Sequence, residues 1–290
     1  MKIRHGQFAS SSITIPYFLA EKIGKHIIKP LETSDGRLYR KIADYTVILY
    51  PFVHGESGKR LLFSKNQWIE FGKLLGAIHT VQLSRETADL PHETWNNKWR
   101  SQSKKYMQEL HRITVRNRYD RQFINLLNVN RGIINEMQET AEELAEKIKN
   151  QKPAFSLCHG DIHAGNILMS ADENEFYIVD WDTLMMAPKE KDLMFIGGGV
   201  ANMWNRDEEE TDFYKGYGDR EAVDLPLLVY YRYERIIEDI VEYYDQFFAD
   251  NIHEENQKAI LERVGTAFIP GGVADMALKA AKKYKAINSA

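Results

Sequence analysis

The sequence predicts an α+β protein, with a small β-rich N-terminal part and a larger, mainly helical C-terminal part. Short apolar runs bounded by turn residues fill much of the first fifty positions, a pattern that is typical of strands. From residue 68 onward, apolar residues recur at helical spacing. The chain has 290 residues, of which 43% are hydrophobic and 28% charged, so it is an ordinary globular sequence that is long enough for two modules.

The N-terminal part is expected to contain one helix and one hairpin. Residues 13–23 read as the helix. The apolar runs 38–42 and 45–50 flank Ala43 and Asp44, which predicts two strands joined by a tight turn. Pro51 ends the second run, and this suits a buried strand that leads into a connector.

Three apolar stripes predict long helices in the C-terminal part. They cover residues 68–78, 133–148 and 233–248, and the third has the clearest amphipathic pattern. In the first stripe Gly72 and Gly76 lie one helical turn apart, where another element can approach closely. We expect all three stripes to belong to the core.

The most informative segment runs from Cys158 to Asp182. Four residues separate Asp161 from Asn166, and Asp180 follows after two short apolar runs with a polar turn between them. A hairpin of this size would fold Asp180 back beside Asn166. Phosphoryl-transfer enzymes of the protein-kinase type use this spacing.

The chemistry of phosphoryl transfer explains these residue types. The reaction needs positioning and charge neutralisation from the protein more than covalent chemistry. We expect Asp161 to accept or orient the proton of a substrate hydroxyl, and Asn166 and Asp180 to offer hard oxygen ligands to Mg²⁺. The sequence therefore predicts a kinase that uses Mg²⁺ and transfers the terminal phosphate of ATP or GTP to a hydroxyl.

Several segments resemble the aminoglycoside phosphotransferases, a family that shares the protein-kinase fold and includes choline and fructosamine kinases. The core strings are His-Gly-Asp-Ile-His-Ala-Gly-Asn at 159–166 and Ile-Val-Asp-Trp-Asp at 178–182. Further similar strings occur at 49–55, 67–72, 75–79, 188–199 and 231–239, and these are most similar to the spectinomycin phosphotransferase branch. The resemblance covers nearly the whole chain. It implies a two-lobe fold, with 1–53 as a partial nucleotide-binding lobe and hinge and 54–290 as a helical lobe that carries the catalytic loop and substrate site.

The resemblance also implies roles for individual residues. It makes Asp161 the catalytic residue and gives the magnesium to Asn166 and Asp180, as the spacing does. The backbone around Tyr50, Phe52 and Val53 would be the hinge that holds the nucleotide base, and Lys2 would pair with the nucleotide phosphates. Only the resemblance assigns roles to these last four residues.

Two departures from the family pattern surround Lys2. Only Met1 precedes it, where the family has two strands and a phosphate-covering loop. The sequence also has no acidic residue between Lys2 and Glu21, although such kinases hold the lysine with a glutamate on the next helix. We therefore expect a truncated N-terminal lobe. Either the true start lies upstream, or this form is a fragment with weakened or no nucleotide turnover. Lys2 as a free terminal lysine is the alternative.

The expected substrate is small, cationic and hydroxylated, such as spectinomycin or a related aminocyclitol or aminoglycoside. The candidate contacts are Trp181, Asp182, Trp204, Asp207 and Glu208. Each has a structural alternative, because acids suit the positive end of a helix and aromatic residues often belong to the core. Another small amino-alcohol or sugar remains a rival substrate.

Composition and the rest of the sequence exclude several other classes. A net charge of −4 argues against nonspecific nucleic-acid binding. Cys158 is the only cysteine, which excludes an intramolecular disulfide and a cysteine-rich zinc site. The sequence contains neither a signal-peptide pattern nor an apolar run of membrane-spanning length, so we expect no membrane partner and a cytoplasmic location.

Two functions from other classes are alternatives to the kinase. A metal-dependent phosphoesterase would explain Gly160 to His163, but such enzymes need further histidines, and His253 is the only one after His163. A kinase-like binding module without turnover would explain the abrupt start at Lys2. It predicts that the sheet containing residues 38–42 has an unpaired edge and self-associates.

Overall fold

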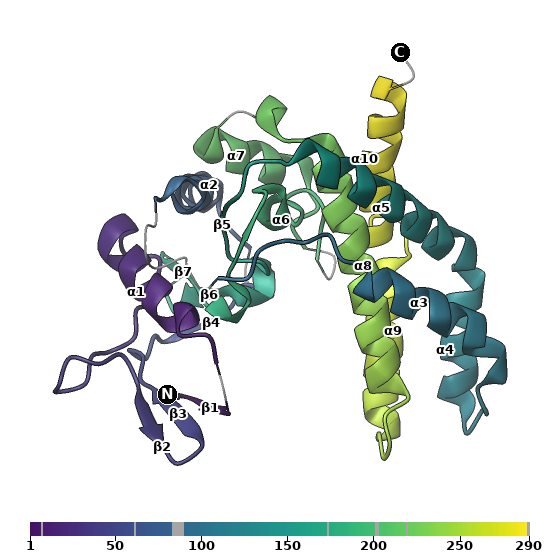
Figure 1. Ribbon diagram of the computed structural model, residues 1–290, viewed down its shortest axis with the longest axis horizontal. Helices are drawn as coiled ribbons and strands as arrows, with labels where there is room; N and C mark the ends of the chain where they lie inside the picture. Colours follow the sequence, from purple (N-terminus) through teal and green to yellow (C-terminus); the bar gives the residue numbers. More distant parts are fainter. Residues whose placement is uncertain are drawn as a thin grey trace. The chain divides into compact units, whose positions relative to one another are not determined.

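The computed structural model describes residues 1–6, 8–60, 62–82, 90–172, 174–200, 203–218 and 220–288 (Figure 1). Contacts between residues group the chain into two compact units. One unit consists of Met1–Glu93, Ala154–Asp192 and Asp207–Ala222, and the other of Thr94–Pro153, Leu193–Arg206 and Val223–Ala290. The lobe boundary expected after Val53 remains a prediction.

The first unit begins with an antiparallel sheet of the strands β1 (Lys2–His5), β2 (Arg40–Ile42) and β3 (Tyr45–Ile48), in the order β1-β3-β2. The predicted hairpin is therefore confirmed, with Ala43 in its turn at φ 51°. Lys2 pairs with Ile48 and Arg4 with Thr46, which places both cations on the face that carries these two buried residues. The opposite face carries the exposed Ile3 and Ile42.

Helix α1 (Ser11–Ile23) lies beside this sheet in Figure 1. It begins two residues before the predicted start and buries Ile13, Ile15 and Leu19 completely. The helix contacts the short 3₁₀ helix η3 (Trp181–Thr183), which immediately follows Asp180. The N-terminal part is thus packed directly against the segment that carries the predicted metal ligand.

Two further small sheets frame the predicted catalytic segment. The strands β4 (Gly55–Ser57), β6 (Ile167–Ser170) and β7 (Phe176–Ile178) form one antiparallel sheet, and β5 (Ser156–Cys158) pairs with β8 (Met185–Ala187) in the other. Strands β6 and β7 form the hairpin predicted between Asn166 and Asp180. The 3₁₀ helix η2 (Ala164–Asn166) leads into β6, and α6 (Glu190–Leu193) follows β8.

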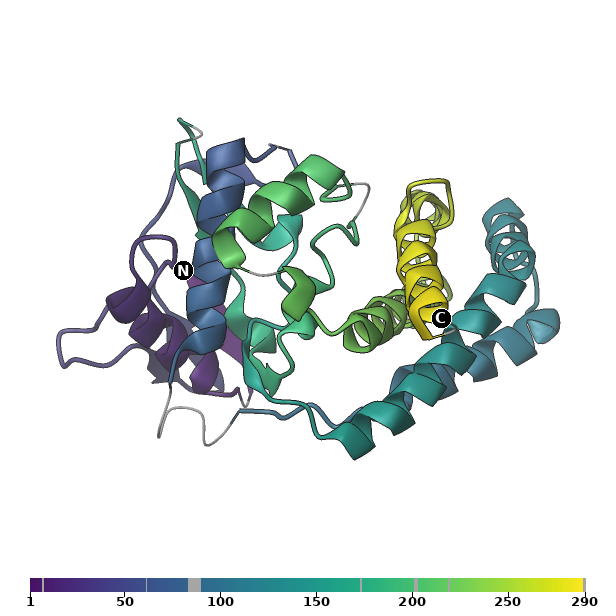
Figure 2. The same ribbon diagram turned by 90° about the horizontal axis from the view of Figure 1, so that it is seen from above.

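Helices α2 (Lys65–Thr80) and α7 (Asp207–Tyr217) pack closely together, and Figure 2 shows them side by side. A capping box between Ser64 and Gln67 begins α2. A Cβ on Gly72 would lie 2.1 Å from the carbonyl oxygen of Phe213, and one on Gly216 would lie 1.8 Å from that of Ile69. The expected close approach at Gly72 is therefore confirmed, and it depends on a second glycine in α7.

The second unit is built from helices around α8 (Leu225–Phe247). Its other helices are α3 (Lys98–Glu109), α4 (Arg118–Val129), α5 (Arg131–Gln151), α9 (Glu254–Ala267) and α10 (Val273–Asn288), with the 3₁₀ helix η1 (Leu110–Arg112) after α3. Helix α8 contacts α3, α5, α9 and α10. The apolar stripe predicted at 233–248 forms its buried face, which includes Tyr233, Ile237 and Val241. In the described part of the chain, none of the helices is apolar over a length that would cross a membrane.

Candidate functional site

The first unit brings Asp161 and Asn166 together in one loop between β5 and β6. The side-chain nitrogen of Asn166 donates to the backbone oxygen of Asp161 at 2.8 Å and to its Oδ2 at 3.2 Å. These bonds fix the amide of Asn166 across the loop and leave its Oδ1 to accept or to coordinate. The Asp161 carboxylate is partly exposed, at 23%, so it remains accessible to a reactant.

Asp180 lies beside this loop because the β6–β7 hairpin folds the chain back. The backbone N–H of Val179 donates to the carbonyl oxygen of Asn166 at 2.9 Å. Asp180 itself has a left-handed backbone with φ 63°, and its side chain is 55% exposed. A non-glycine residue in this region is strained, and such strain is concentrated at functional sites. The three residues predicted from spacing alone therefore converge.

The buried side chain of His159 connects the catalytic loop to the Asp180 segment. Its Nε2 donates to the carbonyl oxygen of Val179 at 3.0 Å, and its Nδ1 accepts from the N–H of Asp161 at 3.4 Å. Burial lowers the pKa of His159, which favours the neutral imidazole that these two partners require. One buried side chain thus bonds both to the backbone of Asp161 and to that of Val179, the residue before Asp180.

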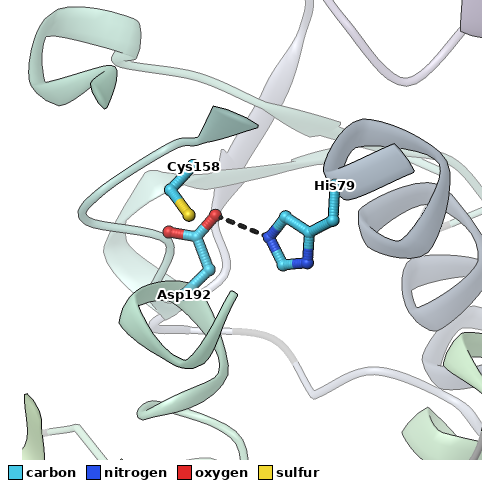
Figure 3. Close-up of side chains that lie close together, drawn as sticks. All are labelled: His79, Cys158 and Asp192. Carbon is cyan, nitrogen blue, oxygen red and sulfur yellow. Dashed lines mark hydrogen bonds and ion pairs between the residues drawn. The ribbon is translucent and has the colours of Figure 1, made fainter. Parts of the chain in front are cut away.

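A buried carboxylate, Asp192, holds the backbone of the catalytic loop. It accepts from the N–H groups of His159 and Gly160, both at 2.8 Å. His79 of α2 donates from Nε2 to the same carboxylate at 3.1 Å, as Figure 3 shows, and its Nδ1 accepts from the Tyr217 hydroxyl at 2.8 Å. Burial alone would raise the pKa of Asp192, but the hydrogen bond from His79, with the backbone bond from Gly160, keeps that pKa below its usual value.

His79, Asp192 and Cys158 also form a group of metal-ligand types, with ligand atoms within 4.8 Å of one another. Both oxygens of Asp192 already accept backbone hydrogen bonds. Burial raises the pKa of the Cys158 thiol well above its usual value, and the sulfur lies 3.5 Å from the carbonyl oxygens of Ala187 and Pro188. A thiol that stays protonated is a poor metal ligand. We therefore assign this cluster a structural role.

Gly160 is required by its surroundings as well as by its backbone. Its φ is +86°, and a Cβ would lie 2.3 Å from the carbonyl oxygen of Thr183. The Thr183 hydroxyl in turn donates to the carbonyl oxygen of His159 at 2.8 Å. The glycine of the His-Gly-Asp string thus allows the loop to contact the segment after Asp180.

His163 follows Asp161 by two residues and has a fixed tautomer. Its Nδ1 accepts from the N–H of Gly165 at 2.9 Å, so the ring proton of the neutral form is on Nε2. That Nε2 lies 3.5 Å from Oδ2 of Asp161. The arrangement orients a positive edge of the imidazole toward the predicted catalytic carboxylate.

Lys2 projects from β1 toward the aspartates that follow β7. Its Nζ lies 3.1 Å from Oδ1 of Asp180 and 2.7 Å from Oδ2 of Asp182. Arg4 pairs with Oδ1 of Asp182. The structure therefore places Lys2 at the predicted metal ligand, in an ion-pair cluster with two aspartates and a second cation.

The three predicted hinge residues have different environments. Tyr50 is half-buried, and burial raises its pKa, while the charge of Arg4 lowers it and that of Asp182 raises it. Phe52 is 82% exposed and packs edge to face on His54 at 4.8 Å, and Val53 is half-buried. Tyr50 thus lies within electrostatic reach of the charged cluster, and Phe52 offers an apolar surface.

The predicted substrate contacts differ in their exposure to solvent. Trp181 is only 5% exposed, packs on His159 at 4.8 Å and donates to the carbonyl oxygen of Ile178. Trp204 is also buried, in the second unit. Asp207 and Glu208 are exposed in the first turn of α7. The burial of both tryptophans agrees with the structural alternative that their sequence context left open.

Sequence reasoning assigned no role to His79, Asp192 or Arg4. Asp192 begins the apolar run Asp-Leu-Met-Phe-Ile, and an acid that continues into a buried run needs a partner, which is a signal for a structural carboxylate. His79 ends an apolar stripe in the same way. Arg4 lies two residues after Lys2, and alternation along a strand would have placed both on one face.

Comparison with known proteins identifies the family. The model of the phosphotransferase enzyme family matches residues 19–230. A crystal structure of spectinomycin phosphotransferase APH(9)-Ia with ADP and spectinomycin has a TM-score of 0.89 and 33% identity, covering 97% of this chain and 85% of that chain. The AMP-bound complex of that enzyme has a TM-score of 0.86 at the same identity, covering 96% and 86%. Protein StrN of Streptomyces griseus is 22% identical over 263 residues, which are 88% of this chain and 75% of that protein.

The resemblance to the spectinomycin phosphotransferase branch and the predicted kinase-like α+β fold are both confirmed by these matches. The family match covers most of the chain and includes the catalytic loop, the β6–β7 hairpin and α2. The chain belongs to the aminoglycoside-type phosphotransferase enzyme family, and it is a phosphotransferase with the kinase-like fold.

Proposed function

We propose that this protein transfers the terminal phosphate of ATP or GTP to a hydroxyl of a small aminocyclitol or aminoglycoside such as spectinomycin. One observation carries the proposal: Asp161, Asn166 and Asp180 converge, with the Lys2 ammonium 3.1 Å from Asp180. Phosphoryl transfer uses a carboxylate that accepts a proton, two oxygen groups that bind a metal ion and a cation that pairs with the phosphates. The proposed donor is consistent with the ADP and AMP complexes of APH(9)-Ia.

Asp161 is the proposed catalytic base. As the substrate hydroxyl oxygen bonds to the γ-phosphorus, the bond from that phosphorus to the β–γ bridging oxygen breaks, and the nucleoside diphosphate leaves. The hydroxyl proton passes to the Asp161 carboxylate. Asn166 holds that carboxylate through its amide N–H, and His163 presents Nε2 at 3.5 Å, so the carboxylate has a fixed orientation.

Asn166 and Asp180 are the proposed magnesium ligands. The Asn166 amide nitrogen is committed to Asp161, which leaves Oδ1, and the exposed Asp180 carboxylate offers a second hard oxygen. Such a donor set fits Mg²⁺, which takes one or two protein oxygens plus phosphate and water. When bound, Mg²⁺ supplies neutralisation of the phosphate charge.

The proposed nucleotide contacts are Lys2 for the phosphates and Tyr50, Phe52 and Val53 for the base. Tyr50 is half-buried within electrostatic reach of Arg4 and Asp182, and Phe52 has an exposed ring. The substrate contacts Trp181, Asp182, Trp204, Asp207 and Glu208 remain predictions. Among them, the exposed carboxylates Asp207 and Glu208 suit a cationic substrate best.

The test measures phosphate transfer from labelled ATP, and from GTP, with Mg²⁺ present. The acceptor panel contains spectinomycin, aminoglycosides, small amino-alcohols and sugars. Asp161→Asn should reduce kcat by about 10²–10⁴-fold, the range for loss of a general base. Asp172→Asn is the matched control, because it makes the same change at an exposed turn residue of the β6–β7 hairpin, and it should stay within about twofold.

The outcomes separate the parts of the proposal. Transfer only to an amino-alcohol or a sugar would replace the proposed substrate and keep the kinase. Near-normal transfer by Asp161→Asn would contradict the catalytic assignment. If spectinomycin is the substrate, expression in sensitive bacteria should raise their resistance, and the reaction would belong in the cytoplasm, where nucleoside triphosphates are abundant.

A further inference from the structure

Lys2 and Arg4 lie on the same face of β1. The register pairs Lys2 with Ile48 and Arg4 with Thr46, and both partners are buried. Residues two positions apart on a strand point the same way. Two cations therefore leave the sheet toward one place.

Asp182 is the residue that both cations reach. Its Oδ2 lies 2.7 Å from the Lys2 Nζ, and its Oδ1 pairs with the Arg4 guanidinium. The contact from Lys2 to Asp180 is longer, at 3.1 Å. Each oxygen of Asp182 thus has its own cation, and the pair with Lys2 does not depend on Asp180.

Helix α1, which follows β1, supplies no carboxylate to Lys2. Its acidic residue is Glu21, near the C-terminal end, and Glu21 pairs with Lys29. The first turn of α1 has no acidic residue. Among the described residues, Lys2 forms ion pairs with Asp180 and Asp182.

We infer that Asp182, held by Arg4, is the counter-ion that positions the Lys2 ammonium for the nucleotide phosphates. The inference rests on the proposed function, because it assigns Asp182 to the nucleotide rather than to the acceptor substrate. Lysine carries its charge on a flexible stem of four carbons and needs an anchor to keep one position. Arg4 can hold the carboxylate more rigidly, since its guanidinium is planar and its side chain is only 16% exposed.

Asp180 and Asp182 then have different roles. Asp180 is the more exposed, at 55% against 37% for Asp182, and a carboxylate that binds a divalent cation gives up part of its attraction for a lysine. Asp182 keeps Lys2 in place when that happens. It is therefore a positioning residue, acting on the nucleotide through Lys2.

The experiment is a double-mutant cycle on the full chain, with any purification tag placed at the C-terminus so that Lys2 keeps its sequence context. The variants are Lys2→Ala, Asp182→Asn and the double variant. ATP binding is measured directly by calorimetry with Mg²⁺ and without acceptor, and KM values for ATP and acceptor are measured where turnover is found. Thermal unfolding of each variant checks that it folds.

Asp182→Asn is expected to weaken ATP binding about tenfold and to leave the acceptor KM within about twofold. In the Lys2→Ala background, the same change should have little further effect. Asp182→Glu should recover part of the ATP affinity. Arg4→Gln should lower the ATP affinity as well, but by less than Asp182→Asn does.

Three results would overturn the inference. One is a rise in acceptor KM with unchanged ATP binding, which would make Asp182 a substrate contact. Another is full additivity of the Lys2 and Asp182 variants, and the third is an Asp182→Asn protein that binds ATP as the wild type does. Because the binding cycle needs no acceptor, it tests the inference even if no acceptor is phosphorylated, and absence of transfer counts against the proposed function alone.

Discussion

Asp192→Ala removes the carboxylate that holds the catalytic loop, and the structure allows its cost to be worked out. The backbone N–H groups of His159 and Gly160 would both lose an acceptor at 2.8 Å, in a place where Asp192 and His159 are fully buried. A buried donor without a partner costs about 1–3 kcal/mol, so the two donors together cost about 2–6 kcal/mol. The free energy of unfolding of a domain is only about 5–15 kcal/mol. We therefore expect a folded but clearly weakened protein.

Urea unfolding measures this loss, and amide hydrogen exchange locates it. In the wild type the N–H groups of His159 and Gly160 should exchange slowly, and in Asp192→Ala both should become fast. Asp192→Asn should lose less, because an amide oxygen can still accept from one of the two donors. The control is Glu56→Ala, an exposed acid of the same unit paired to Arg60 at 3.4 Å, which should change the free energy by under about 1 kcal/mol.

The reasoning would be refuted by an Asp192→Ala protein that unfolds at the same urea concentration as the wild type with both amides still protected. A drop in phosphate transfer with unchanged protection would also contradict it. In that case Asp192 would act on the reaction by some path other than the loop backbone.

Gly72→Ala should destabilise the protein by about 1–3 kcal/mol in urea unfolding, because the new methyl would meet the Phe213 backbone in α7. Gly132→Ala in α5, where nothing lies within 4 Å of a Cβ, should instead stabilise by about 0.5–1 kcal/mol, and equal losses at both glycines would contradict the packing argument. Because the pKa of His159 is lowered in the folded state, the unfolded chain binds the proton of this imidazole more readily than the folded one. The contribution of His159 to the free energy of unfolding is therefore complete above its unfolded pKa of about 6.5, and it is lost as pH falls through the lower folded pKa. Urea midpoints measured from pH 7.5 to 4.5 should therefore fall, and His159→Gln should flatten this slope; an unchanged slope would show that other groups cause it. Replacing His163 by Gln should lower kcat more than it raises the ATP KM, because the imidazole faces Asp161 at 3.5 Å, and a pure KM effect would count against this.

The parts of the site that the sequence predicted are those fixed by local geometry. Asp161 and Asn166 are close in sequence, and a hairpin of the predicted length returns Asp180 to them. The sequence predicted that another element approaches closely at Gly72, because two glycines one helical turn apart leave room for it; the structure shows that this element is α7. In each case a few neighbouring residues determine the outcome.

The missed residues depend on contacts between distant segments. His79 and Asp192 are 113 positions apart, and the 178 positions between Arg4 and Asp182 are even harder to pair by inspection. Nothing local distinguishes a histidine at the end of an apolar stripe from one that packs in the core. The role of Trp181 stays a prediction: its position next to Asp180 suggested a ligand contact, and its ring packs on His159.

The attachment of the catalytic loop to interior groups affects which substitutions this enzyme can tolerate. The loop backbone is held by two groups in the interior, Asp192 and His159, together with the Thr183 hydroxyl. Exposed positions such as Asp207 and Glu208 can then be exchanged without dismantling the reaction centre. In such a scaffold, single substitutions at the surface can change which acceptor molecule binds, while the phosphate-transfer chemistry stays the same.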